Sequence, residues 1–565
     1  MNDRTWLGSY PPGVPADIDP SQYASLVALM EESFRKYCGR VAYSFMGKDV
    51  SYAETDAQSR DLAAYLQSLG LAKGDRVALM MPNVPQYPVA VAAVLRAGLV
   101  VVNVNPLYTP RELEHQLKDS GAKAIVIIEN FAHTLQSCLA HTPVEHVVLA
   151  SMGDRLGFLK GAVVNYVVRN VKKLVPLFQL PGAVRFNDAL TQGAGMPLAQ
   201  PSLQPDDVAL LQYTGGTTGV SKGAVLLHRN VIANVLQSEA WNLPAMARVP
   251  AGEQPTTVCA LPLYHIFAFT VNMMLSLRTG GKTILIPNPR DLPAVLKELS
   301  KHTFHSFPAV NTLFNGLANH PQFGTVNWKN LRVSLGGGMA VQGAVAKLWL
   351  EKTGCPICEG YGLSETSPSA SCNPITAKEF TGTIGVPLPS TYMKLIDDEG
   401  REVTGVGRAG EIAIKGPQVM AGYWQRPDET AKVMTTDGYF RSGDIGVMDE
   451  RGFFKIVDRK KDMVLVSSFN VYPNEVEDVV AGMPGVLECA VVGVPDDKTG
   501  EAVKLVIVKR PPAPGGEELT EAHVREFCKA NLTGYKQPRV IEFRTELPKT
   551  PVGKILRREL RDKRA

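Results

Sequence analysis

One stretch decides the fold of this chain: Tyr213-Thr214-Gly215-Gly216-Thr217-Thr218-Gly219-Val220-Ser221-Lys222-Gly223. The apolar run before it, residues 207–212, is predicted to be a short buried strand, and the apolar pattern resumes at 224–228. Four glycines let the backbone N–H groups turn toward one point. Three threonine hydroxyls and the ammonium of Lys222 add donors and positive charge. This inventory indicates a loop that holds a polyphosphate.

The simplest alternative for this stretch is an ordinary surface turn rich in glycine and threonine. Few surface turns carry so many hydrogen-bond donors together. The stretch is not a Walker A motif, because that motif places Gly-Lys-Ser/Thr after four intervening residues, and here Lys222 precedes Gly223. We therefore expect a phosphate-binding loop of another kind.

Length and composition exclude several classes of protein. A chain of 565 residues predicts more than one domain and a large core. The 59 basic and 55 acidic residues give a net charge of +4, which is too balanced to indicate a nucleic-acid partner. Eight scattered cysteines and the lack of a signal peptide favour reduced thiols in a cytoplasm. The apolar run 89–104 contains Arg96 and Asn103 and is too short to span a membrane.

Strand-like and helix-like segments alternate after residue 75. The predicted strands are 76–80, 99–103 and 124–128, and the predicted helices are 86–98 and 110–120. This alternation predicts a parallel sheet covered by helices. Shorter segments near the C-terminus predict a small α+β module. The expected fold class is therefore α/β, with a large N-terminal domain of helix-flanked β-sheets (1–457) and a smaller α+β C-terminal domain (463–565) joined by a hinge (458–462).

Residues 155–185 stand apart from the rest of the chain, since they contain six Lys or Arg and no Asp or Glu. Wound as a helix, this segment would gather Leu156, Leu159, Val163, Tyr166 and Val167 on one side. The opposite side would carry Arg155, Arg169, Lys172 and Lys173. Such a pattern is typical of a helix lying on an anionic membrane surface. An ordinary surface helix packed on the core is an equally good interpretation.

Three later segments carry polar residues on turns that contain glycine: 361–366, 442–444 and 551–554. Each is a weak signal alone. Together with the loop 213–223 and the polar run 459–462, they resemble, in order, the motifs of acyl-adenylate-forming enzymes. That superfamily includes acyl-CoA synthetases, peptide-synthetase adenylation domains and luciferases. The resemblance covers essentially the whole chain. Segments 99–114, 262–267 and 469–475 look most like those of bacterial long-chain fatty acid–CoA ligases.

The resemblance implies a two-step reaction with a fatty acid, ATP and CoA as substrates and Mg²⁺ as cofactor. The fatty carboxylate attacks the α-phosphate of ATP, which gives acyl-AMP and pyrophosphate. The CoA thiol then attacks the acyl carbon and releases AMP. The resemblance also implies a cytoplasmic enzyme, and we expect 155–185 to bring it to the inner face of the membrane. Relatives are often homodimers, but the oligomeric state and the preferred chain length cannot be deduced from the sequence.

The resemblance also assigns roles to individual residues. Catalysis falls to Lys554, Glu365 and Thr217, of which Glu365 and Thr217 would bind Mg²⁺. ATP and AMP would be bound by Thr214, Gly215, Gly216, Thr217, Thr218, Gly219, Lys222, Gly336, Gly337, Gly338, Glu359, Gly360, Tyr361, Gly362, Thr366, Asp444 and Arg459. The acyl chain and CoA would meet His265, Phe267, Ser467 and Ser468. Lys461 would be the hinge residue about which the C-terminal domain turns between the two steps.

One departure from the family pattern leaves alternatives open. Relatives usually carry Ser-Gly after the hinge strand, where this chain has Ser467-Ser468. The glycine lines the passage of the pantetheine arm, so an added hydroxymethyl group there bears on the thioester step. The alternatives are an acyl-adenylate ligase that passes the acyl group to a carrier protein, a medium-chain ligase, and an ATP-binding scaffold without turnover.

Overall fold

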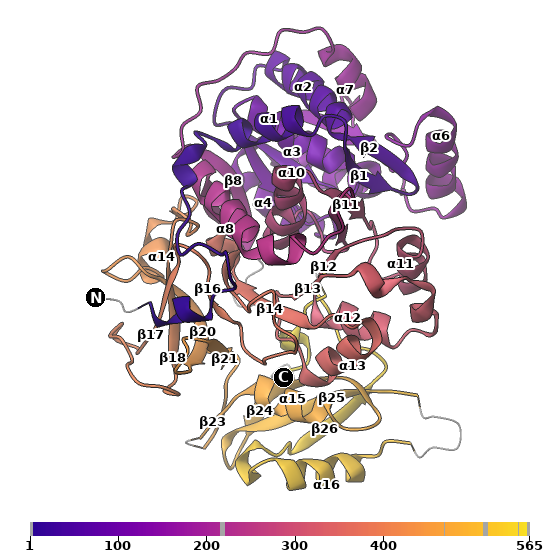
Figure 1. Cartoon of the computed structure of the whole chain (residues 1–565). Helices are drawn as coiled ribbons and strands as arrows, with labels where there is room; N and C mark the ends of the chain where they lie inside the picture. The colour runs from indigo at the N-terminus through magenta and orange to yellow at the C-terminus, as the bar shows by residue number, and fades with distance from the viewer. Residues whose placement is uncertain (1–3, 215–220, 468, 512–517, 552, 562–565) are drawn as a thin grey trace.

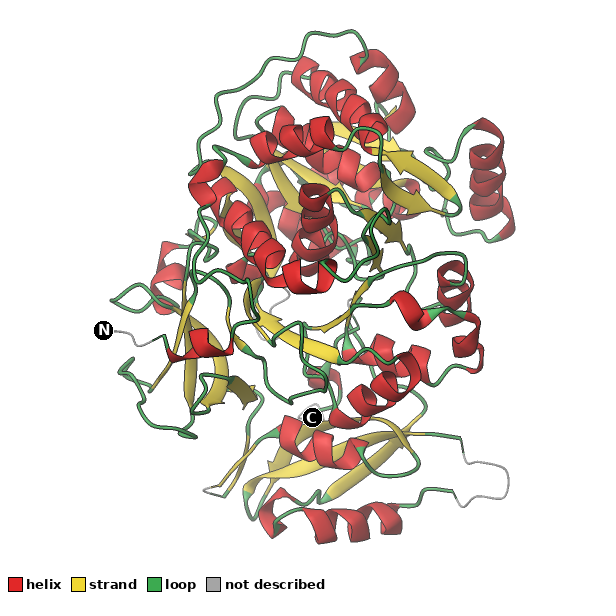
Figure 2. Cartoon of the chain, in the orientation of Figure 1, coloured by secondary structure: helices red, strands yellow, loops and turns green. Residues whose placement is uncertain are grey.

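The computed structural model describes residues 4–214, 221–467, 469–511, 518–551 and 553–561. The chain forms a large body and, at its C-terminal end, a smaller one that is drawn in yellow in Figure 1. Helices flank the strands of the large body, as Figure 2 shows. The predicted fold class, α/β with a large N-terminal domain and a smaller C-terminal one, is confirmed.

The phosphate-loop candidate joins two strands of an eight-stranded sheet. These strands, β8 and β9, run antiparallel, and Thr214 lies opposite Lys222 in their register. Strands β4, β3 and β5 are parallel, as the alternation predicted. In spatial order the sheet contains β19 (Gly422–Tyr423), β9 (Lys222–Leu227), β8 (Val208–Thr214), β4 (Val100–Asn103), β3 (Arg76–Met80), β5 (Ala122–Ile128), β6 (His146–Ala150) and β7 (Val184–Arg185).

Helix α4 (Pro110–Ser120) shows how local sequence sets the ends of an element. Thr109 and Glu112 form a capping box, in which the Thr109 N–H donates to Glu112 Oε2 at 2.8 Å. Pro110 occupies the first helical position, where no N–H donor is needed. Gly121 ends the helix with a φ of +63°, a left-handed conformation that suits glycine. The predicted bounds of this helix are confirmed.

Two further sheets of the large body surround the candidate site. A nine-stranded sheet contains, in spatial order, β16 (Val386–Pro387), β15 (Ser369–Cys372), β14 (Ile357–Gly362), β13 (Val333–Gly336), β12 (Ser306–Ala309), β10 (Thr256–Cys259), β11 (Lys282–Leu285), β1 (Val41–Phe45) and β2 (Lys48–Ser51). A four-stranded antiparallel sheet contains β17 (Tyr392–Ile396), β18 (Gly410–Lys415), β20 (Phe440–Met448) and β21 (Phe454–Arg459).

The C-terminal body has its own sheet and its own apolar core. Its strands are β22 (Val464–Val466), β23 (Phe469–Val471), β24 (Val486–Asp496), β25 (Gly500–Lys509) and β26 (Val540–Arg544). Helices α15 (Pro473–Ala481) and α16 (Glu521–Asn531) flank this sheet in Figure 2. Residues 460–463 connect β21 of the four-stranded sheet with β22 of the C-terminal sheet.

The remaining α-helices belong to the large body. They are α1 (Leu26–Lys36), α2 (Tyr52–Ser68), α3 (Gln86–Arg96), α5 (Ala132–Gln136), α6 (Phe158–Tyr166), α7 (Phe186–Gly193), α8 (His228–Met246), α9 (Ile266–Ala268), α10 (Leu275–Thr279), α11 (Leu292–Leu299), α12 (Asn311–Ala318), α13 (Gly343–Thr353) and α14 (Pro427–Lys432). Within the described parts of the chain, no helix has the length and apolarity that a membrane crossing would require.

The structure corrects the prediction of one long amphipathic helix over 155–185. Only α6 and a π-helical turn, Val167–Val171, are helical within this segment, and the rest is irregular apart from the short strand β7 at its end. Leu159, Val163 and Tyr166 do share one face, but that face is exposed, while Leu156 is buried. The expected basic face is also wrong in part, because Arg169 turns inward onto Glu129. In Figure 1, α6 projects from the edge of the large body.

Candidate active site

A cavity of about 530 Å³ lies where the two bodies meet. Most of the predicted site residues that the structure describes line it, although they come from distant parts of the chain. These lining residues are Thr214, His265, Phe267, Gly337, Gly338, Gly360, Tyr361, Gly362, Glu365, Asp444, Arg459, Lys461 and Lys554. Six other predicted residues, Gly215, Gly216, Thr217, Thr218, Gly219 and Ser468, lie outside the described residues.

Glycines at the end of β13 allow the backbone that lines the cavity to lie close to side chains from other segments. A Cβ placed on Gly337 would lie 3.0 Å from the ring of Phe267. Gly338 has a φ of +79°, and a Cβ there would lie 3.5 Å from Cε of Lys554. Gly336 does not line the cavity. A Cβ there would meet Val341 Cγ2 at 2.5 Å, so its role is close packing beneath the wall.

Tyr361, Asp444 and Arg459 form a connected polar group in this cavity, in which Tyr361 and Asp444 are buried and Arg459 is partly exposed. The Tyr361 hydroxyl donates to Asp444 Oδ2 at 2.6 Å, and Arg459 Nε lies 3.2 Å from Asp444 Oδ1. Asp444 and Arg459 face each other because they are register partners on β20 and β21. Burial, and then the charge of Asp444, raises the pKa of Tyr361, which keeps the phenol protonated. The arrangement presents a fixed carboxylate and a guanidinium, a pair suited to binding sugar hydroxyls.

Glu365 lies on a 3-10 turn, Ser364–Thr366, that enters the cavity. Burial raises the pKa of its carboxyl, and its Oε1 accepts a hydrogen bond from Tyr423 at 2.7 Å. Thr366 does not line the cavity. Its hydroxyl accepts from Leu363 N at 2.9 Å and also donates to Pro368 O, so it holds the turn that carries Glu365.

Two other predicted nucleotide ligands lie outside the cavity lining. Glu359 is buried on β14, where its Oε1 accepts from the N–H of Val341 at 3.1 Å, and burial raises its pKa to about 8. The ammonium of Lys222 pairs with Glu429 of α14 and lies 4.9 Å from the centre of the Tyr423 ring. Tyr423 therefore links the end of the phosphate-loop candidate to Glu365.

Lys554 reaches the cavity from the C-terminal body. The hydroxyl of Thr312, at the start of α12, donates to Gly553 O at 3.1 Å, which fixes the segment that carries the lysine. The Lys554 N–H donates to Thr550 Oγ1 at 3.0 Å within the same turn. Burial, and then the positive charge of Arg459, lowers the pKa of Lys554 to about 8. The lysine is therefore a half-buried cation, and the charges of Asp444 and Glu365 favour its protonated form.

Part of the cavity lining is apolar. Trp241, Val271, Ile375 and Leu388 belong to it, together with Cys372. His265 also lines the cavity. Burial, and then the charge of Lys554, lowers the pKa of His265 to about 3, so the ring is neutral and its Nδ1 accepts from Phe267 N at 3.3 Å. A cavity lined by both apolar side chains and a cation suits a ligand with a hydrocarbon part and an acidic end.

Ser467 does not line the cavity in this arrangement of the two bodies. It is exposed, with a φ of +57°, and its N–H donates to Thr499 O at 2.7 Å. Sequence reasoning missed Tyr423 and Thr312, which hold Glu365 and the lysine segment. Both lie outside the motifs, and only the folded chain brings them to their partners.

Comparison with known proteins identifies the family. Residues 30–424 match the family model described as AMP-binding enzyme, and residues 475–554 match that described as AMP-binding enzyme C-terminal domain. The solved structure of ATP-bound MatB from Rhodopseudomonas palustris is 29% identical to this chain, with a TM-score of 0.79, and the match covers 94% of this chain and 98% of MatB.

Two curated relatives carry the name long-chain-fatty-acid–CoA ligase. The one from Escherichia coli O6:H1 is 54% identical over 560 residues, which are 99% of this chain and 98% of the relative. The one from Bacillus subtilis strain 168 is 37% identical, with 99% of this chain and 98% of the relative covered. The chain belongs to the AMP-binding enzyme family.

Proposed function

We propose that this protein is an AMP-forming long-chain fatty acid–CoA ligase, which activates a fatty acid with ATP through an acyl-AMP intermediate. The observation that carries the proposal is the position of Lys554. The ammonium of half-buried Lys554 lines one cavity with the Tyr361–Asp444–Arg459 group, with Glu365 and with apolar side chains. The names of the two curated relatives support the same reaction.

In the first step, Asp444 and Arg459 bind the ribose and Tyr361 lies against the adenine. The apolar side chains of the cavity receive the acyl chain, and neutral His265 adds no competing charge. Lys554 attracts both the fatty carboxylate and the α-phosphate, and so brings two anions together. Phosphoryl chemistry of this type depends mainly on positioning and on neutralising charge.

Mg²⁺ fits the residues at the phosphate end of the cavity. Glu365 offers a hard carboxylate oxygen there, and its Oε1 is already oriented by the Tyr423 hydroxyl. Mg²⁺ is usually held by one or two carboxylates together with substrate phosphates, so a single carboxylate is sufficient. Glu365 and Thr217 would hold the ion, which neutralises phosphate charge when bound. Lys222 and the loop 214–219 would hold the β- and γ-phosphates.

In the second step, the C-terminal domain (463–565) turns on the N-terminal domain (1–457) about the hinge 458–462, with Lys461 as the pivot. The turn withdraws Lys554 and brings Ser467 and Ser468 to the CoA thiol. Support for two bodies comes from residues 460–463, which join strands of two different sheets. Homodimer formation remains a prediction from the resemblance.

We also propose that α6 contacts an anionic membrane surface at the inner face of the cytoplasmic membrane. Phe158 is 89% exposed and Leu159 is 78% exposed, on a face that also presents Val163 and Tyr166. Two features fix this face outward. First, Gly153 and Gly161 allow the backbone of α6 to contact the backbone at residue 153, since a Cβ on either glycine would lie 2.4 Å from the carbonyl oxygen of the other. Second, Arg169 binds buried Glu129 through two hydrogen bonds of 2.9 Å. Exposed Lys172 and Lys173 follow the helix.

The decisive experiment measures pyrophosphate release and acyl-CoA formation with fatty acids of increasing chain length, with and without CoA. We expect acyl-CoA to form fastest from long chains. Pyrophosphate release without acyl-CoA would indicate an acyl-adenylate ligase that serves a carrier protein. A maximum at medium chain length would indicate a medium-chain ligase. No pyrophosphate release with any acid would overturn the proposal and leave an ATP-binding scaffold.

A further inference from the structure

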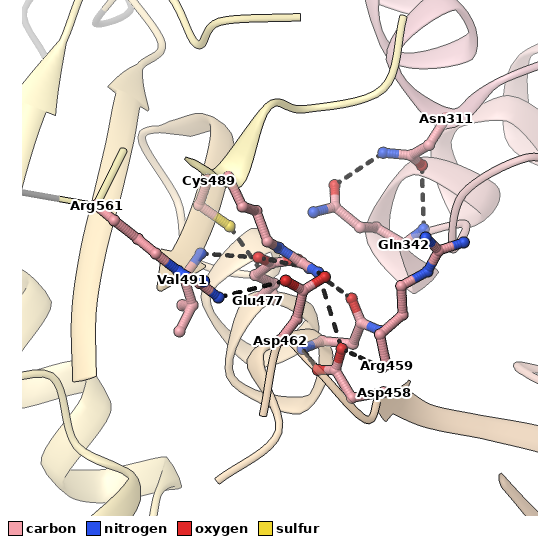
Figure 3. Close-up of polar contacts among 11 residues, drawn as sticks. Asn311, Gln342, Asp458, Arg459, Asp462, Glu477, Cys489, Val491 and Arg561 are labelled. Atoms are coloured by element: carbon pink, nitrogen blue, oxygen red, sulfur yellow. Dashed lines mark hydrogen bonds and ion pairs between the residues drawn. The ribbon is translucent and has the colours of Figure 1, made fainter. Parts of the chain in front are cut away.

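A polar network centred on Arg557 lies where β21 passes into the C-terminal body. Figure 3 shows the carboxylates of Asp458, Asp462 and Glu477 converging in this region. Arg557 Nη2 donates to both oxygens of Glu477, at 2.9 and 2.8 Å, and to Asn474 Oδ1 at 2.7 Å. Arg557 Nη1 lies 3.8 Å from Asp458 Oδ1 and 3.7 Å from Asp462 Oδ2. One guanidinium therefore contacts acidic groups from three segments.

The members of this network lie on two sides of the proposed pivot, Lys461. Asp458 belongs to β21 and therefore to the sheet of the large body. Asp462, Asn474, Glu477 and Arg557 all follow residue 461 and would move with the C-terminal domain. Asp458 Oδ2 also accepts a hydrogen bond from Asn474 N at 3.0 Å. A turn of the C-terminal domain about Lys461 would break the contacts of Asp458 and keep those of Asp462 with Arg557.

The contact that Asp458 makes with the C-terminal body is more deeply buried than two other contacts between the bodies. The Asp458 side chain is 0% exposed. Asn315 Nδ2 donates to Leu487 O at 2.8 Å, and Gly343 N donates to exposed Asp478 at 3.1 Å. Those contacts involve a backbone carbonyl and a surface carboxylate, which water can replace at modest cost. The Asp458 carboxylate is fully buried in this orientation, and the partners that Asn474 and Arg557 supply to it come from the C-terminal body, so the seat of Asp458 is specific for one domain orientation.

The network is connected to catalysis through the chain itself. Arg557 lies shortly after Lys554 in the C-terminal segment that the hydrogen bond from Thr312 to Gly553 O holds in place. The domain orientation that seats Asp458 against Asn474 and Arg557 is therefore the one that places Lys554 in the cavity.

We propose that Asp458 is a positioning residue that favours the domain orientation for adenylation, and that its release from Asn474 and Arg557 accompanies the turn to the thioester step. This inference rests on the proposed two-step function. Burial outweighs the attraction of Arg557 and, with the nearby charge of Glu477, raises the pKa of Asp458 to about 6. In this orientation the backbone N–H of Asn474 and the guanidinium of Arg557 are the groups from the C-terminal body that compensate the buried carboxylate.

The test compares Asp458→Ala with Asp462→Ala, because both aspartates face Arg557 but only Asp458 lies before the pivot. Two single-turnover rates are measured for each variant: pyrophosphate release from ATP and fatty acid, and acyl transfer from supplied acyl-AMP to CoA. We expect Asp458→Ala to slow pyrophosphate release about tenfold and to leave acyl transfer equal or faster. Asp462→Ala should change both rates by the same factor.

Asp458→Asn is a second variant, which tests the role of Asp458 if the Asp458→Ala variant does not fold. It keeps one oxygen acceptor for Asn474 N, so its ratio of the two rates should lie between wild type and Asp458→Ala. Equal effects on both rates, or none, in the folded Asp458 variants would overturn the inference. In that case wild type would still perform both steps, so the proposed function would stand. A wild-type enzyme that releases no pyrophosphate would instead overturn the proposed function.

Discussion

Lys554 and Asp444 carry opposite charges in the same cavity, and other segments hold each of them in place. Asp444 is fixed by Tyr361 and Arg459, and the lysine segment is fixed by Thr312. At the scale of the residue, the site is a group of charged side chains, and residues from other segments hold each of them in position. Each charge can be removed singly, and the two half-reactions then report its role.

Replacing Lys554 tests whether its ammonium acts only while two anions meet. We expect Lys554→Ala to slow adenylate formation by about two to three decades, since one preorganised charge contact in a transition state is worth ~3–4 kcal/mol. Transfer from supplied acyl-AMP to CoA should stay near the wild-type rate. Single-turnover rates of both steps provide the measurement. An equal loss in both steps would show that Lys554 is structural.

The lowered pKa of Lys554 predicts a pH dependence. Because that pKa is about 8, the lysine is mainly charged below pH 8 and loses its proton as pH rises through this value. We therefore expect adenylation to decline above about pH 8 and acyl transfer to lack this inflection. The Lys554→Ala variant should lack it in both steps. A wild-type adenylation rate that is flat up to pH 10, near the usual lysine value of about 10.4, would contradict the assignment.

At the scale of the element, α6 reverses the usual arrangement of an amphipathic helix on a protein core. Its small inner residues, Gly161 among them, bring the backbone close to the body, and its large apolar residues face outward. Arg169 contributes to this orientation through buried Glu129, to which Arg185 Nη1 also donates at 2.9 Å. The exposed face can therefore be altered without disturbing the anchor.

Leu159→Glu combined with Val163→Glu should release the enzyme from anionic vesicles. Burying one large apolar side chain contributes roughly 1.5–3 kcal/mol, so losing two should weaken binding more than tenfold. Turnover of a soluble short-chain acid should not change. Vesicle co-sedimentation and a soluble activity assay are the two measurements, and co-sedimentation equal to that of wild type would refute the membrane contact of α6.

Matched variants separate charge from apolar contact in this experiment. Lys172→Glu with Lys173→Glu should weaken vesicle binding by roughly 1 kcal/mol per residue, and the effect should shrink as salt is added. Arg169→Ala is a poor probe of the surface, because it removes a partner of the buried Glu129 carboxylate. It should lower the melting temperature instead, since a buried charge loses part of its compensation.

The elements that the sequence predicted well are those whose signals are local. The bounds of α4 follow from Thr109, Pro110, Glu112 and Gly121, which are all neighbours in the chain. Contacts between distant segments have no such signal. The Arg169–Glu129 pair is one example, and it is the reason that the predicted basic face was wrong.

The same distinction holds for the candidate site. Resemblance assigned Tyr361, Asp444, Arg459 and Lys554 to the site from the order of motifs along the chain, and in the structure these four residues line one cavity. It also included Glu359 and Thr366, which the structure uses to hold the strand and turn beneath the cavity wall. Residue type and spacing cannot distinguish a ligand from its support, since both are polar and adjacent.

At the scale of the whole molecule, both bodies contribute to the cavity lining, because Lys554 belongs to one and Tyr361 to the other. Any change in the orientation of the C-terminal body changes the chemistry of the cavity. The contact between Gly343 and Asp478 offers a way to fix that orientation, since a Cβ on Gly343 would lie 3.7 Å from Asp478 Oδ1.

A disulfide between Gly343→Cys and Asp478→Cys should trap the orientation for adenylation. We expect the oxidised variant to release pyrophosphate but to transfer the acyl group to CoA at least tenfold more slowly, with recovery on reduction. The exposed Cys38 should be changed to Ser in the same chain, because the other native cysteines are buried. Rapid acyl transfer by the fully oxidised variant would argue against a turn of the C-terminal domain.

The outward apolar face of α6 has a consequence for handling the purified protein. In buffer without lipid, Phe158 and Leu159 remain exposed to water, and two molecules can reduce that exposure by pressing these faces together. The protein should therefore self-associate as its concentration rises. A mild detergent should reverse this by covering the same side chains, so the apparent size in solution will depend on the additive in the buffer.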